Sequence, residues 1–145
     1  MLDTGPLGLI SEDILKTQVA KMSAWLGRYM NSGYDIFIHE IADYEVRREL
    51  IRTHSITGIA RLEALNVEFS YLAITTIAMH RAAEFWAQVR RVGLPTASPE
   101  ALDGDCILAA QAVSINRPGY SVTITTTNLR HLSRFSGFEL LDCPI

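Results

Sequence analysis

Three stretches, far apart along the chain, each offer carboxylates that could take part in metal-ion chemistry. Asp3 stands between a short apolar start and a Thr-Gly-Pro turn, and Glu45 lies in a charged segment near the middle. Asp103 and Asp105 flank a glycine nearer the end. Clustered carboxylates repel one another, and a divalent cation is the usual means of compensating them. If folding brings these stretches together, we expect them to form a cation site.

The segment Asp103-Gly104-Asp105 is predicted to open a helix whose apolar face must be buried. Helix capping is the simpler interpretation, because an Asp in the first turn satisfies free N–H groups and the helix dipole. One Asp would be enough for that. The second carboxylate places extra negative charge beside a core, which favours a functional role for Asp105.

Glu45 lies in a predicted helix that is dense with charge. An ion pair with Arg48, three residues on, is the competing interpretation of this residue. Glu45 also follows Ile41 and Tyr44, which places it at the edge of the expected buried stripe and favours a functional role. Asp43 is predicted to lie on the surface.

Asn128 follows the strand-like run 121–126. Taken alone, an Asn at this point is ordinary turn chemistry. In a doubly wound sheet, however, the end of this strand would face Asp3, and ligands bind where such strands end. There the amide of Asn128 could position a metal-bound water.

Strands alternate with helices, which predicts an α/β protein with a mostly parallel sheet and helices on both faces. We expect short strands at residues 1–2, 36–38, 71–74, 121–126 and 139–141. We expect helices at residues 14–31, 41–54, 56–68, 75–92, 103–117 and 129–135, and a loop at 94–101.

The bulk properties indicate one globular domain spanning residues 1–145, with 48% hydrophobic residues and a net charge of −3. That charge argues against a protein that coats nucleic acid through bulk electrostatics. Of 13 basic residues, only Lys16 and Lys21 are lysines, and arginine suits bidentate phosphate contacts. The sequence shows no membrane span or secretory signal, and its two cysteines lack metal-type spacing, so we expect a cytoplasmic protein.

Four blocks of the sequence together resemble the PIN-domain ribonucleases, and in particular the VapC-like toxins of type II toxin–antitoxin modules. The blocks are Leu2–Leu7, Ile41–Leu50, Asp103–Ala110 and Thr126–Asn128. The resemblance covers essentially the whole chain. It implies a three-layer α/β/α fold with a five-stranded, mostly parallel sheet in the order 3-2-1-4-5.

The resemblance also implies a metal-dependent endoribonuclease that cleaves single-stranded RNA. Its catalytic positions fall on Asp3, Glu45, Asp105 and Asn128. The implied Mg²⁺ or Mn²⁺ would be held by Asp3, Glu45 and Asp105, with Asp103 helping through a water. The sequence departs from the family pattern in its curtailed first strand and in the amide at position 128.

The implied partners are an RNA substrate, a small cognate antitoxin and a second copy of the chain in a homodimer, with no membrane. By position alone, Arg130 or Arg134 could hold flanking phosphates. A catalytically idle PIN-fold module with an RNA-binding or regulatory role is the alternative. A phosphohydrolase using Asp3 as nucleophile ranks last, because such enzymes carry a second Asp where this chain has Gly5.

Overall fold

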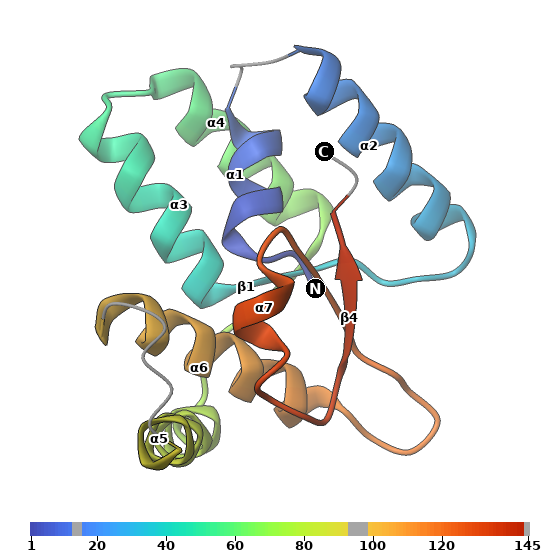
Figure 1. Cartoon of the computed structure of the whole chain (residues 1–145). Coiled ribbons are helices and arrows are strands. Elements are labelled where there is room, and N and C mark those ends of the chain that lie inside the picture. Colours follow the sequence, from blue (N-terminus) through green and yellow to red (C-terminus); the bar gives the residue numbers. More distant parts are fainter. Residues whose placement is uncertain (13–15, 93–98, 144–145) are drawn as a thin grey trace.

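The structure is a computed structural model that describes residues 1–12, 16–92 and 99–143. Its helices are α1 Thr4–Ser11, α2 Lys16–Asn31, α3 Glu40–Arg52, α4 Ile56–Glu68, α5 Thr76–Arg91, α6 Pro99–Ile115 and α7 Leu129–Leu132. Its strands are β1 Phe37–His39, β2 Ser70–Leu72, β3 Thr123–Thr126 and β4 Glu139–Asp142. Pairs of helices alternate with single strands through most of the chain, which confirms the predicted α/β class (Figure 1).

Several helix boundaries follow from local signals that the sequence shows. The side chains of Ser55 and Thr75 accept hydrogen bonds from backbone N–H groups in the first turns of α4 and α5, as N-cap residues do. Just after α2, Gly33 has a φ of +85°, a conformation that glycine adopts without steric cost. The start of helix 14–31 and the glycine expected to stop α5 at Gly93 lie outside the described residues.

The prediction of one continuous five-stranded sheet is wrong for the described residues. Among the described residues the strands form two parallel pairs, β1 with β2 and β3 with β4. The expected first strand is reduced to Leu2, which forms isolated parallel bridges to Ile38 of β1 and Thr125 of β3. The chain turns into α1 immediately after Asp3, so no further residue is left to lengthen that strand.

Residues 1–3 nevertheless lie between the two pairs and join them through the backbone. The N–H of Leu2 donates to the Phe37 carbonyl at 3.1 Å, and the N–H of Asp3 donates to the Thr125 carbonyl at 2.9 Å. Counting Leu2 in the place of a strand, the order β2, β1, Leu2, β3, β4 follows the order 3-2-1-4-5. The carboxyl ends of these segments therefore meet at one edge, where Asp3 lies.

Two apolar clusters hold the helices in place. One contains buried residues of α1 to α4 together with Leu2 and Ile38, and the other contains buried residues of α5, α6 and β3. Leu2 is 1% exposed and Ile124 of β3 is fully buried, so the centre of the structure is closed to water. Figure 1 shows these two groups of helices on opposite sides of β1 and the N-terminus. No helix among the described segments is long and apolar enough to cross a membrane.

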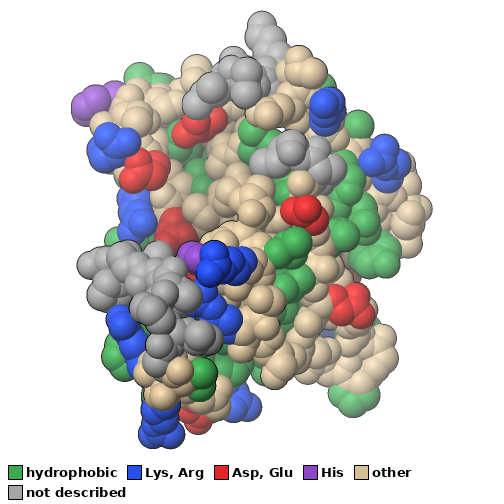
Figure 2. Space-filling model, in the orientation of Figure 1, with side chains coloured by type: hydrophobic (Ala, Val, Ile, Leu, Met, Phe, Trp, Pro, Cys, Tyr) green, Lys and Arg blue, Asp and Glu red, His purple; other side chains and the backbone are tan. Residues whose placement is uncertain are grey.

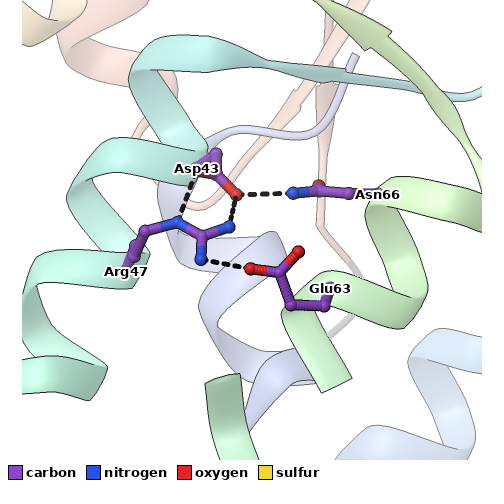
Figure 3. A network of polar contacts seen from close by, with 4 residues as sticks. All are labelled: Asp43, Arg47, Glu63 and Asn66. Atoms are coloured by element: carbon purple, nitrogen blue, oxygen red, sulfur yellow. Dashed lines mark hydrogen bonds and ion pairs between the residues drawn. The ribbon is translucent and has the colours of Figure 1, made fainter. Parts of the chain in front are cut away.

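A polar network fixes α3 against α4 (Figure 3). Arg47 donates two hydrogen bonds of 2.9 Å to Asp43 and reaches Glu63 of α4, while the amide of Asn66 donates to Asp43 at 2.7 Å. The prediction that Asp43 lies on the surface is therefore wrong, since it is 6% exposed. Its partner Asn66 comes from another helix, which helical spacing within α3 could not reveal.

Two further expectations are corrected by the helices themselves. Asp103-Gly104-Asp105 does not open α6, which begins at Pro99 inside the predicted loop. Proline suits the first turn of a helix because its missing N–H has no partner there. Tyr44 is 56% exposed rather than part of a buried stripe, and the apolar buried residues of α3 are Ala42, Val46 and Leu50.

Candidate functional site

Asp3 lies at the point where the central segment ends and α1 begins. One carboxylate oxygen accepts from the Thr4 N–H at 2.7 Å, which caps α1, and the other accepts from the Thr126 hydroxyl at 2.6 Å. Burial raises the pKa of Asp3, and these two hydrogen bonds act in the opposite direction. Thr126 ends β3, so Asp3 is tied to the adjacent segment of the sheet.

Glu45 projects from α3 toward the same place. The Thr4 hydroxyl donates to its carboxylate at 2.5 Å, so Thr4 bonds to both acids, through its backbone N–H to Asp3 and through its hydroxyl to Glu45. The predicted ion pair with Arg48 exists, but at 3.9 Å it is long, and the Arg48 side chain is 52% exposed. The functional and ion-pair interpretations of Glu45 are therefore compatible.

The second turn of α6 passes directly beside Glu45, and Gly104 permits that approach. A Cβ atom added at Gly104 would lie 2.7 Å from Oε1 of Glu45, closer than real Cβ contacts allow. The glycine between the two aspartates thus has a definite spatial role. It lets the carboxylate of α3 lie against the backbone of α6.

The carboxyl group of Asp105 is strongly perturbed by its surroundings. Burial and then the negative charges of Asp3 and Glu45 raise its pKa to about 7, while Arg134 acts in the opposite direction. Its Oδ2 lies 3.4 Å from Nδ1 of His131, but this buried oxygen accepts no hydrogen bond from any described residue. The three carboxylates therefore share one electrostatic environment.

The other two predicted residues lie less centrally. Asp103 has an exposed side chain on α6. Asn128 is half-buried, and its side chain makes no capping hydrogen bond to α7. Its backbone N–H donates to the Thr126 hydroxyl at 2.8 Å, and that hydroxyl is the one bound to Asp3. The segment at Asn128 is thus linked to Asp3 through Thr126.

These residues suit a hard divalent cation by their chemistry. Mg²⁺ and Mn²⁺ prefer oxygen ligands, and Mg²⁺ is usually held by only a few carboxylates together with water. The orphaned buried Oδ2 of Asp105 provides a ligand atom that the protein leaves unused. Within residues 1–12, 16–92 and 99–143, no three acidic, histidine or cysteine side chains already form a metal-ligand cluster. Repulsion between like charges opposes such a cluster.

Sequence reasoning missed four residues that shape this site. Thr4 and Thr126 hold the carboxylates, Gly104 makes room for one, and His131 contacts another. For Thr4 the available signal was its place directly after Asp3 at the end of a strand. The other contacts join elements that are distant in sequence, and no spacing rule could have found them.

Comparison with known proteins supports the fold. No protein-family model matches the sequence, and no curated protein matches it significantly. Among solved structures, a chain of VapBC2 from Rickettsia felis bound to a promoter DNA fragment has a TM-score of 0.76 at 15% identity, covering 98% of this chain and 96% of that chain. A chain of DNA-bound VapBC from Salmonella typhimurium has a TM-score of 0.67 at 22% identity, with coverages of 98% and 96%.

These similarities define the class of fold. At such low identity they establish architecture alone, and that architecture is found in VapBC toxin–antitoxin complexes. The resemblance to VapC-like PIN proteins drawn from the four sequence blocks is therefore confirmed at the level of the fold.

Proposed function

We propose that the protein is a PIN-type, metal-dependent endoribonuclease that cleaves single-stranded RNA and serves as the toxin of a toxin–antitoxin pair. One observation carries this proposal: three distant parts of the chain bring Asp3 and Glu45 close enough to act electrostatically on Asp105, and Thr4 bonds to both Asp3 and Glu45. Strongly perturbed titratable groups that cluster in this way are typical of functional sites. The shared fold with VapBC chains agrees with it.

In this proposal Asp3, Glu45 and Asp105 hold a Mg²⁺ or Mn²⁺ ion, with Asp103 assisting through a water. When bound, the ion would lower the pKa of an attacking water and polarise the phosphoryl oxygen. The chain's own task is to orient the ligands. The Thr4 hydroxyl fixes one oxygen of Glu45, and the Thr126 hydroxyl fixes one oxygen of Asp3. Asn128 would orient water or substrate from the turn after β3.

The test is cleavage of a labelled single-stranded RNA with and without Mg²⁺ or Mn²⁺. We expect Asp3→Asn and Asp105→Asn to abolish metal-dependent cleavage while far-UV circular dichroism and the unfolding transition remain. Asp35→Asn, which removes the same negative charge at an exposed position, serves as the control for handling and charge. Cleavage at the parent rate in both Asp variants would overturn the assignment.

A second candidate, the catalytically idle PIN-fold module, is favoured by the amide at position 128. Calorimetric titration with Mn²⁺ separates the two candidates, because an idle module need not bind a metal. We expect saturable binding by the parent protein and a large loss of affinity in Asp105→Asn. Absence of heat in the parent would favour the idle module.

The toxin role implies a small antitoxin partner, a homodimer and a cytoplasmic site of action. The two similar structures are both VapBC complexes with DNA, which supports a partner of the antitoxin kind. Co-expression with the product of the adjacent gene, followed by co-purification, tests this partnership. Light scattering of the isolated protein tests the dimer.

A further inference from the structure

The turn that follows β3 brings positive charge against the acidic site. His131 of α7 lies 3.4 Å from Asp105, and Arg134, three residues on, acts electrostatically on the same carboxylate. In the view of Figure 2, basic and histidine side chains meet acidic ones over the region where the lower end of α3 approaches α6 and α7 in Figure 1. Positive charge at this border can attract an anionic ligand that the carboxylates alone would repel.

The backbone around Arg134 is held in place by its two neighbours in the apolar core. It lies just beyond α7, where the Phe135 N–H donates to the Leu132 carbonyl and continues the helical turn. Leu132 is fully buried, and the ring of Phe135 packs on Phe85 of α5 with centroids 5.3 Å apart. These two anchors fix the backbone on either side of Arg134.

The guanidinium of Arg134 leaves a hydrogen-bond donor unused. Its Nη1 is buried and donates to no acceptor in the described part of the chain, and no described carboxylate lies within ion-pair distance of it. Leaving a buried charged donor unsatisfied is costly, so such groups usually have a partner in the functional state. Planar arginine groups bind phosphate oxygens in a bidentate manner, and Arg134 as a whole is only half-buried, so a ligand from solvent can reach its side chain.

We infer that Arg134 is a substrate-binding residue that holds a phosphate of the RNA backbone next to the acidic site. This inference rests on the proposed ribonuclease function and extends it to a residue outside the carboxylate set. Arg130 has an exposed side chain, and His131 already contacts Asp105, so Arg134 is the basic group of this turn whose buried donor is free to bind an anion.

The experiment measures binding of a fluorescent single-stranded RNA by anisotropy over a range of salt concentrations. Both the parent and the variants carry Asp3→Asn, so that no RNA is cleaved during the titration. We expect Arg134→Gln to weaken binding about tenfold to a hundredfold, the usual effect of losing charged hydrogen bonds. The slope of log K against log salt should become less negative by about 0.7, the change for one phosphate contact on a single strand.

Two further variants make the result specific. Arg134→Lys keeps the charge but not the bidentate geometry, so it should keep the salt slope and recover only part of the affinity. Arg28→Gln makes the same change in charge on the exposed surface of α2, which Figure 1 shows away from α6 and α7, and should bind like the parent. Circular dichroism establishes that each variant is folded.

The outcomes separate this inference from the proposed function. If the parent binds RNA and Arg134→Gln binds it equally well, the role of Arg134 is refuted while the nuclease proposal stands. If the parent binds no RNA, the proposed function falls and this inference falls with it. If Arg134→Gln weakens only the complex with the antitoxin, the donor serves a protein carboxylate and the inference is wrong.

Discussion

Removing the charge of Asp105 should stabilise the metal-free protein, which is unusual for a substitution at a half-buried polar residue. In the folded chain the pKa of this carboxyl group is raised from its ordinary value of 3.8 to about 7 by burial and by Asp3 and Glu45. Between these two values the native state binds the proton more tightly than the unfolded state. The contribution of Asp105 to stability is therefore complete below about pH 4 and is lost as the pH rises to about 7.

The size of this effect follows from the pKa values. A change in pKa from 3.8 to about 7 corresponds to about 4 kcal/mol in the free energy of unfolding. The side chain is 16% exposed, and the effective dielectric constant near protein charges is high, so we expect about 1–2 kcal/mol. For a chain of this length that is a rise in Tm of about 2–8 °C for Asp105→Asn.

The assay is thermal and urea unfolding of the parent and Asp105→Asn from pH 4 to pH 8 in the presence of a chelator. The two proteins should differ little at pH 4 and diverge as the pH rises, with the variant more stable. Asp103→Asn is the matched control, because it removes the same charge from an exposed position on the same helix. Added Mg²⁺ should stabilise the parent and reduce the difference, since a ligand that binds only the folded state stabilises it.

One result would refute the electrostatic reasoning. If Asp105→Asn is no more stable than the parent at pH 8 without metal, Asp105 is not destabilised by its acidic neighbours. The same conclusion would follow if Asp103→Asn stabilised the protein equally, because the effect would then reflect net charge rather than the site.

Three further outcomes are expected. Gly104→Ala improves helix propensity by about 1 kcal/mol, but its Cβ should displace the carboxylate of Glu45. We therefore expect slower RNA cleavage and weaker Mn²⁺ binding. An unchanged Mn²⁺ affinity in calorimetric titration would contradict this. Thr126→Val should lower the free energy of unfolding in urea by about 2–4 kcal/mol, because one oxygen of Asp3 loses its donor and the Asn128 N–H loses its acceptor. Thr126→Ser keeps the hydroxyl and should retain most of the stability. His54→Gly should raise stability by about 1 kcal/mol, because His54 has a φ of +54°; a lower urea midpoint would show that its side chain matters more than its backbone.

The helices were largely predictable from sequence because their signals are local. The segment 56–68 shows apolar residues at helical spacing after a serine cap, and α4 occupies that range. The sheet was less predictable because strand length depends on partners. At residues 1–3 the early turn into α1 limits strand pairing to isolated bridges at Leu2. The apolar and β-branched residues of a sequence do not predict where such a turn ends a strand.

The candidate site was predictable in outline and not in detail. The clustering of acidic residues in the sequence and the resemblance to PIN-domain proteins led us to expect Asp3, Glu45 and Asp105 together, and their role in catalysis stays a prediction. The interactions that hold them come from across the fold, such as the hydroxyl of Thr126 on Asp3, 123 positions away. The burial of Asp43 had the same cause, because its partner Asn66 belongs to a different helix. Such pairs follow from tertiary packing, which a single sequence does not show.

The position of Leu2 between β1 and β3 has a consequence for biosynthesis. A ribosome-bound chain that has not yet released residues 123–126 offers Asp3 neither the Thr125 carbonyl nor the Thr126 hydroxyl. Contacts between such distant positions form late and slowly in folding. A nascent or truncated polypeptide without residues 123–126 would therefore lack the hydrogen bonds that hold Asp3 in the acidic centre.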